Sequence, residues 1–368
     1  MTDTREITLG DIESLAVGAW ILGTGGGGNP YISKLHCLQE LRRGMRVPLI
    51  GLDELDDDAF VVSMGGIGAP VVTVEKLQEG REGERAVRAL EEFCGRRVTA
   101  VIPGEIGGAN AIAPIIAAGQ IGVGVVDADG MGRAFPEMQM CTFSIYGRRS
   151  VPATLTDERG NIVIFREALS EEWIEKLVRA SVIAMGGAAV GAEAPMSGRF
   201  VKRVSVPGTI SQAIALGQIV LDAGRAHANP IERICAHEHG VHLMDAKIVD
   251  LKRHLKGGFS VGTIALDGID MHAGSRAEVV FQNEFLLFRR EGRVEVTVPD
   301  LIVILDVDTG HAITTDVLRY GQRVAIVALP CHPVLRTPEA LAVVGPSAFG
   351  FEGVAFQPLP LPNAESLP

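Results

Sequence analysis

Three acidic side chains stand directly after apolar, strand-like segments of the sequence. Glu105 follows VTAVIPG, whereas Asp127 and Asp129 follow IGVGVV. Carboxylates that lie close together raise one another's pKa, which suits proton transfer near neutral pH, and they can also ligate a hard cation. Alternatively, they cap helices and hold turns, which are common roles of acidic residues in loops. We expect Glu105, Asp127 and Asp129 to be catalytic if the segments end at one edge of a sheet.

Glycines and further polar residues lie at or near the ends of the same strand-like segments. Arg133 is either an ion-pair partner for a nearby carboxylate or a clamp for a substrate carboxylate, and we place it with the catalytic group. Backbone N–H groups at Gly66, or at Gly107 and Gly108, could stabilise negative charge that develops on a substrate. The substrate-binding residues expected in this region are Gly66, Gly107, Gly108, Asn110 and Glu137.

A glycine-rich segment, GTGGGGNPY, begins at Gly23. Free N–H groups at the start of a helix can cradle an anion. A helix-like segment precedes the glycines, whereas a dinucleotide fingerprint needs a strand there, and the lysine of a P-loop is absent. The alternative is a tight connection between two helices. We expect a backbone wall of the substrate site, formed by Thr24, Gly25, Gly26, Gly27, Gly28 and Asn29.

Three histidines lie close together in AHEHGVHLMD, namely His237, His239 and His242. Imidazoles are common metal ligands, so these residues are a possible site for a divalent metal. Their spacing is not that of a helical HExxH zinc motif. A polar site without metal and ordinary surface histidines are the alternatives, and no cofactor is required by the sequence.

The pair Asn283-Glu284 interrupts the apolar segment VVFQNEFLLF. Polar side chains inside an apolar strand need hydrogen-bonding partners. We expect this pair either to make a polar contact between domains or to reach a functional site.

The segments that must position the acids alternate between strand-like and helix-like patterns. Apolar runs at 59–66, 98–105 and 121–130 predict strands, and helical spacing predicts helices at 83–95 and 107–119. Such alternation is typical of a parallel sheet with right-handed crossovers. Ligands of parallel sheets bind beyond the carboxyl ends of the strands, where all three segments carry glycine or acidic residues.

The second half of the chain has a different character. Helices are expected at 170–187 and 208–224, and alternation with β-branched residues predicts many strands from 242 onward. Strand-like segments are also expected at 141–147 and 197–208. We therefore predict an N-terminal parallel-sheet α/β domain, residues 1–166, and a β-rich C-terminal domain with a helix pair, residues 167–360. The helix pair is expected to pack on a barrel or sandwich.

Composition narrows the possible partners and the compartment. The 368 residues carry a net charge of −11, which argues against nucleic acid and anionic membranes as partners. No uninterrupted apolar run approaches the roughly 20 residues that span a bilayer. The acidic, polar N-terminus does not resemble a signal peptide, and the five scattered cysteines lack a CxxC pair. We expect a cytoplasmic homo-oligomer that acts on a small molecule.

Several segments together resemble the S-methyl-thiohydantoin desulfurase family, which is also described as hydantoinase/oxoprolinase-related. They are ILGTGGGGNPY, PGEIGGANA, VDADGMGRAFPEMQM, FQNEF, PDLIVILDVDTGHAITTDVLRYGQRVAIVALP and VGPSAFGF. The resemblance extends from about Leu9 to Phe351 and keeps the order of the motifs. Cys331 and His332 depart from it, because small or apolar residues are expected between the flanking prolines.

The resemblance implies an N-terminal and a C-terminal domain and a hydrolase function. The implied reaction converts a 2-methylthio-imidazolone ring, a cyclic ureide, to hydantoin with loss of methanethiol. Ring opening of a hydantoin or another cyclic amide is the first alternative, and a non-catalytic subunit of a hydantoinase/oxoprolinase complex is the second. The matching motif positions are Gly25 to Gly28, Glu105, Asn110, Asp127, Asp129, Arg133 and Glu137.

Overall fold

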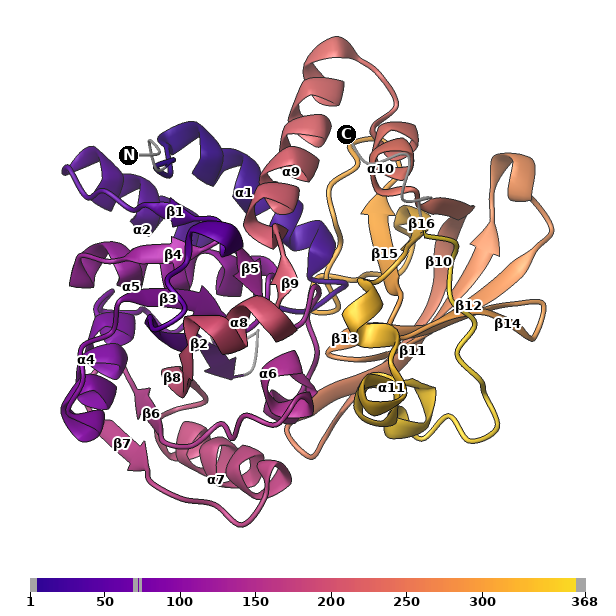
Figure 1. Cartoon of the computed structure of the whole chain (residues 1–368). Coiled ribbons are helices and arrows are strands. Elements are labelled where there is room, and N and C mark those ends of the chain that lie inside the picture. Colours follow the sequence, from indigo (N-terminus) through magenta and orange to yellow (C-terminus); the bar gives the residue numbers. More distant parts are fainter. Residues whose placement is uncertain (1–4, 69–71, 73–74, 362–368) are drawn as a thin grey trace.

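The computed structural model describes residues 5–68, 72 and 75–361. Two seven-stranded sheets form its framework, with helices packed around the first sheet and between the two (Figure 1). The first sheet has the order β1-β4-β3-β2-β8-β6-β7, and the second has the order β14-β13-β12-β11-β10-β16-β15. The fold is therefore mixed α/β, with a partly parallel first sheet and a curled antiparallel second sheet, as the sequence predicted.

The three predicted strands lie side by side and point the same way. They are β2 (Phe60–Gly68), β3 (Ala100–Pro103) and β4 (Gly124–Val126), and β1 (Leu49–Ile50) pairs with β4 in parallel. Helices α4 (Glu82–Cys94) and α5 (Ala113–Ile121) make the crossovers. The carboxyl ends of β2 and β3 therefore meet at one edge.

The other half of the first sheet is antiparallel. It consists of β8 (Ala188–Ser197), β6 (Ala153–Thr156) and β7 (Ile162–Phe165). In β6, the hydroxyl groups of Thr154 and Thr156 donate to carbonyls of α4, whereas Leu155 between them packs against α7 (Glu171–Ala184). Because alternate residues of a strand face opposite sides, α4 and α7 cover opposite faces of this sheet.

Two long helices, α1 (Leu9–Leu22) and α9 (Thr209–Ala226), lie side by side between the two sheets (Figure 1). They approach closely because glycines face each other at the crossing. A Cβ atom on Gly18 would lie 1.7 Å from the carbonyl oxygen of Ala213, and one on Gly217 would lie 1.8 Å from that of Ser14. The helix α2 (Tyr31–Arg42) follows the glycine-rich segment, and α10 (Pro230–Glu238) follows α9.

All neighbouring strands of the second sheet run antiparallel. Phe281, Phe285 and Phe288 are fully buried in one core cluster. Phe281 pairs with Phe285 and Val279 pairs with Phe288, so a register shift near Phe281 lets all three rings face the same side. The sheet curls, so that strands near its two ends contact one another. Its strands are β10 (Val241–Lys256), β11 (Phe259–Gly268), β12 (Arg276–Gln282), β13 (Glu284–Arg290), β14 (Arg293–Thr297), β15 (Leu301–Asp306) and β16 (Arg323–Leu329). The short helix α11 (Pro338–Val344) follows them.

Two strand predictions were wrong. Residues 141–147 contain the short helix α6 (Thr142–Ile145), and residues 197–208 form α8 (Gly198–Val204) and the two-residue strand β9 (Val206–Pro207). The side chain of Ser197 accepts a hydrogen bond from the N–H of Phe200 and so caps α8. Capping and tertiary packing outweigh the β-propensity of the valines there.

The strand β8 belongs to the first sheet although it follows residue 166 in the sequence. The chain therefore contributes a further strand to the first sheet before the strands of the second sheet begin. The domain division at residue 166 stays a prediction. Across the described part of the chain, no helix combines the length and the apolar character needed to cross a membrane.

Candidate active site

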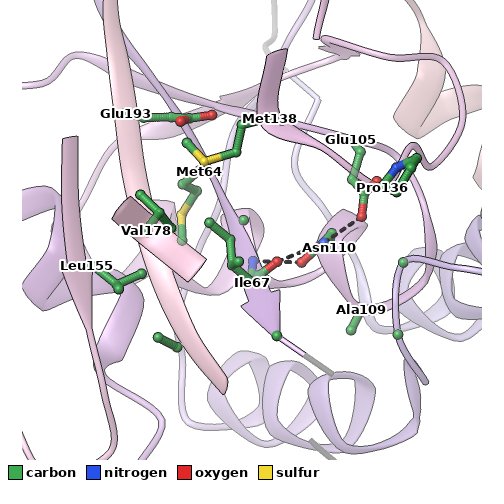
Figure 2. Close-up of a pocket in the computed structure, with 18 of the residues that line it drawn as sticks. Met64, Ile67, Glu105, Ala109, Asn110, Pro136, Met138, Leu155, Val178 and Glu193 are labelled. Atoms are coloured by element: carbon green, nitrogen blue, oxygen red, sulfur yellow. Dashed lines mark hydrogen bonds between the residues drawn. The ribbon is translucent and has the colours of Figure 1, made fainter. Parts of the chain in front are cut away.

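A cavity of about 270 Å³ lies over the α7 side of the first sheet, at the carboxyl ends of β2 and β3. Its floor is formed by strand residues with little or no side chain, including Gly65, Ala189 and Gly191. Its walls come from the glycine-rich segment, the start of α2, Gln78, the loop after β3, residues 135–138, α7 and the turn at 283–284. Figure 2 shows Glu105 and Asn110 at one end, and Leu155, Val178 and Met138 toward the other.

Asn110 connects the strand ends at the polar end of the cavity. Its Oδ1 atom accepts the backbone N–H of Gly66 over 2.7 Å, and its Nδ2 atom donates to Oε1 of Glu105 over 2.6 Å (Figure 2). The same Nδ2 atom also donates to the carbonyl oxygen of Gly66 at 3.2 Å. The orientation of the Glu105 carboxylate is therefore fixed from the end of the neighbouring strand. Because the N–H of Gly66 is already used, it is not a free donor for a substrate.

The environment of Glu105 makes it able to exchange a proton near neutral pH. Burial raises the pKa of Glu105 to about 7, against the lowering effect of hydrogen bonds from Asn110 and from the N–H of Phe135. The nearby Asp129 raises this pKa further, and Arg133 lowers it. A carboxyl group with this pKa, at the edge of a cavity, meets the requirements of a general base.

The cavity is lined by part of the predicted set, namely Gly27, Gly28, Asn29, Gly66, Glu105, Asn110 and Glu137. Glu137 accepts a hydrogen bond from the side chain of Gln139. Asn29 accepts the N–H of Tyr31, so it also holds the start of α2. The remaining predicted residues lie outside the cavity lining, each for a recognisable structural reason.

Asp127 and Asp129 accept hydrogen bonds from nearby protein groups and do not line the cavity. The Asp127 carboxylate accepts the N–H and the hydroxyl group of Ser211, at 3.0 and 2.6 Å, in the first turn of α9. Asp129 is fully buried and accepts the N–H groups of Ile106, Met131 and Gly132 at 2.8–3.0 Å. The structure thus places these two carboxylates in a helix cap and a turn, outside the residues that line the cavity.

Arg133 is fully buried and is used in a junction between the two halves of the chain. Its guanidinium donates to the hydroxyl group of Thr24 over 2.7 Å and to the carbonyl oxygens of Phe285 and Asp300 at 3.0 and 2.9 Å. Burial lowers the pKa of Arg133 to about 10, so the group stays charged at neutral pH. These contacts place Arg133 in a structural junction, outside the residues that line the cavity.

The glycine-rich segment divides into two parts. Its first part contacts the second sheet, where the carbonyl oxygens of Thr24 and Gly25 accept the N–H groups of Phe285 and Thr315 at 2.8 and 3.0 Å. Its second part, Gly27 and Gly28, packs against Gly107 and Gly108 backbone to backbone. A Cβ on Gly108, which has a φ of +51°, would lie 2.1 Å from the carbonyl oxygen of Gly28. The structure places these packing positions outside the cavity lining, namely Thr24, Gly25, Gly26, Gly107 and Gly108.

The three histidines have different surroundings in the structure. His237 bonds to Glu238 at 2.8 Å, whereas His242 bonds to Asp245 at 2.9 Å, and His239 ends α10 in a left-handed conformation. Within residues 5–68, 72 and 75–361, no group of three or more His, Cys, Asp or Glu side chains is placed to hold a metal ion. The residues proposed as metal ligands do not form such a group here.

Glu284 reaches the cavity from the second sheet, which is one of the two outcomes expected for the Asn283-Glu284 pair. It is 3% exposed and lies against Gly26, where a Cβ atom would be 1.9 Å from its Oε1 atom. Its Oε2 atom is buried without a hydrogen-bond partner among the described residues. Burial and the nearby Glu105 raise the pKa of Glu284 well above its usual range. Burial therefore favours the protonated form of this carboxyl group, which can donate a hydrogen bond.

The apolar end of the cavity was not predicted from the sequence. It contains Ile67, Met138, Leu155 and Val178, which pack around the buried start of α7, and a further acid, Glu193 of β8. Beside them, Arg179 donates to Glu175 and to the carbonyl oxygen of Pro136, and its guanidinium lies 4.2 Å from the ring centre of Phe259. The amphipathic pattern of α7 shows that one face is buried, but no local signal indicates what that face covers.

The fold is therefore a mixed α/β fold with a cavity at the carboxyl ends of two parallel strands. The chain belongs to the S-Me-THD-like family: the N-terminal domain model matches residues 10–167, and the C-terminal domain model matches residues 169–359. A crystal structure of a protein from Chromobacterium violaceum has the same fold. It is 24% identical, with a TM-score of 0.78 over 96% of this chain and 99% of the other. Among curated proteins, none matches this chain.

Proposed function

We propose that this protein hydrolyses S-methyl-thiohydantoin to hydantoin with loss of methanethiol. Membership of the S-Me-THD-like family supports a thiohydantoin-related substrate. The observation that carries the proposal is Glu105, a carboxyl group with a pKa raised to about 7 that Asn110 orients at the polar end of the cavity. Such a group can activate water at neutral pH without a metal ion.

In the proposed reaction, water attacks the ring carbon that bears sulfur, and the Glu105 carboxylate accepts a proton from this water. Asn110 keeps the carboxylate in one orientation, which lowers the entropy cost of the step. Negative charge develops on the ring nitrogen next to the attacked carbon. In its protonated form, which burial favours, the carboxyl group of Glu284 can donate a hydrogen bond to that charge, because its Oε2 atom has no partner among the described residues.

The two ends of the cavity match the two sides of such a substrate. A thiohydantoin ring carries carbonyl and N–H groups, which suit the end with Glu105 and Asn110. A methylthio group is small and apolar, and it suits the end formed by Ile67, Leu155 and Val178. With the substrate bound in this way, the ring carbon that bears sulfur would lie between the two ends.

Incubation of the purified protein with S-methyl-thiohydantoin, hydantoin and 5-oxoproline tests the proposal. Methanethiol release and ring opening are followed separately, before and after treatment with a chelator. We expect methanethiol from the first compound and no ring opening of the other two. Ring opening of hydantoin would instead support the cyclic-amide hydrolase alternative. No product from any compound would favour a non-catalytic subunit of a hydantoinase/oxoprolinase complex, and activity lost only on chelation would indicate a divalent metal.

A further inference from the structure

The side chain of Glu193 enters the cavity from the centre of the first sheet. The register of β2 and β8 pairs Ile67 with Ala189, Gly65 with Gly191, and Ser63 with Glu193. Paired residues of neighbouring strands face the same side, so Ala189, Gly191 and Glu193 share the face beneath the cavity. The small residues at 189 and 191 leave open the space in front of the Glu193 carboxyl group, and Figure 2 shows this group beside Met138.

A β-bulge follows Glu193 directly. Ser63 pairs with Glu193 and Val61 pairs with Met196, so two steps along β2 correspond to three steps along β8. Within the bulge, Ala194 has a φ of +48°, a left-handed conformation that residues with a Cβ atom adopt rarely. Bulges often lie beside functional sites, where they change the direction of a side chain. Here the bulge ends the regular alternation immediately after the acid that faces the cavity.

The surroundings of Glu193 favour the neutral form of its carboxyl group. Its Oε2 atom is buried, and the described residues offer it no hydrogen-bond partner. The charged groups that face it from α7 are Glu171 and Glu175, and the guanidinium of Arg179 on the same helix is engaged by Glu175. Burial, with added repulsion from Glu171 and Glu175, raises the pKa of Glu193 to about 8. Glu193 is therefore a proton donor at a pH at which Glu105 has begun to ionise.

We propose that Glu193 is a second catalytic residue, which protonates the sulfur of the departing methanethiolate at the apolar end of the cavity; this rests on the proposed hydrolysis. Side chains such as Leu155 and Val178 cannot solvate a thiolate, so an uncharged leaving group is favoured there. The two acids then have separate tasks, with Glu105 acting on water and Glu193 acting on sulfur.

The protons balance over one turnover. Glu105 takes the first proton of the attacking water, the new C–O bond forms, and Glu105 passes this proton to the ring nitrogen. The C–S bond then breaks as Glu193 gives its proton to sulfur, which releases methanethiol. The remaining hydroxyl proton on the ring carbon passes to the Glu193 carboxylate as the carbonyl group forms. Both acids return to their starting states, and no oxidant or reductant is needed.

The test compares two leaving groups in wild-type protein, Glu193→Gln and Glu193→Asp. One substrate carries methylthio, and the other carries 2,2,2-trifluoroethylthio, whose thiol is more acidic and leaves without protonation. We expect Glu193→Gln to lower kcat/KM for the methylthio compound by about 100-fold or more and that for the fluorinated compound by only about threefold. Glu193→Asp keeps the acid and should recover part of the loss. Glu92→Gln, an exposed position on α4, is the matched control.

Hydantoin binding by each variant shows that the cavity is intact. Equal losses of kcat/KM on both substrates, or undiminished turnover by Glu193→Gln, would overturn the role of Glu193 while the proposed hydrolysis stands. No methanethiol from wild-type protein would refute the proposed hydrolysis itself, and the role of Glu193 with it.

Discussion

The amide of Asn110 donates to the carboxylate of Glu105 over 2.6 Å, and its oxygen accepts the N–H of Gly66 at the end of the neighbouring strand. The general base of the proposed reaction is thus held by two strand ends at once. Precise orientation of a catalytic group depends on such supporting contacts.

Replacement of Asn110 by alanine should slow the reaction without removing the base. The hydrogen bond from Asn110 lowers the pKa of Glu105, so its loss should move that pKa above about 7. We expect kcat to fall about tenfold and the acidic limb of the pH–rate profile to move to higher pH. Initial rates of methanethiol release between pH 5.5 and 9.5 measure both effects. An acidic limb that stays in place would show that Asn110 does not support Glu105.

The pH dependence of wild-type kcat/KM should be bell-shaped with a narrow maximum. Activity requires Glu105 as a carboxylate and Glu193 as an acid, and their pKa values are raised to about 7 and about 8. Activity should therefore rise as pH passes 7 and fall as pH passes 8. In Glu193→Gln the alkaline limb should disappear, whereas the acidic limb should remain. A profile that is flat between pH 6 and 9 would contradict both assignments.

Gly26→Ala tests the position of Glu284. The new Cβ atom would lie 1.9 Å from Oε1 of Glu284, so this side chain must move. Gly26 has no left-handed φ, so backbone strain is not expected. We expect kcat/KM to fall by about tenfold or more. Gly224→Ala is the matched control, because it lies within α9 with open space around its Cβ position, and it should leave the rate unchanged.

Asp127→Ala should affect stability and not catalysis. This residue accepts the N–H and hydroxyl groups of Ser211 in the first turn of α9, and loss of such a cap costs about 1 kcal/mol. We expect a lower midpoint in urea unfolding and an unchanged kcat/KM at temperatures where the protein stays folded. A large loss of kcat with unchanged stability would indicate that Asp127 is catalytic.

Local sequence patterns were sufficient to predict the parallel strands and the presence of Glu105 at the cavity. Apolar runs that end in glycines predicted β2, β3 and β4 and their parallel arrangement, which is what brings Glu105 to the cavity. Asp127 and Asp129 occupy the same kind of position in the sequence. Their partners decide their roles, and Ser211 lies 84 residues beyond Asp127. Local sequence does not contain that information.

Glu193 could not be predicted for a similar reason. It lies in β8, a strand formed after the expected domain division, and β8 inserts between β2 and β6. The small residues of β8 indicate that this strand packs closely against its surroundings. Only the pairing of β8 with β2 shows that one of its faces lines a cavity. Strand pairing over such a distance depends on the whole fold. Glu284 differs, because its polar character inside an apolar segment marked it as a residue in need of a partner.

Methanethiol release from S-methyl-thiohydantoin by wild-type protein and by Glu105→Gln tests the central claim most directly. The glutamine keeps the size of the side chain and cannot accept a proton from water. We expect methanethiol from the wild-type protein and a loss of kcat of about 100-fold or more in the variant, with hydantoin binding retained. Equal rates of methanethiol release by the two proteins would contradict the assignment of Glu105 as the base.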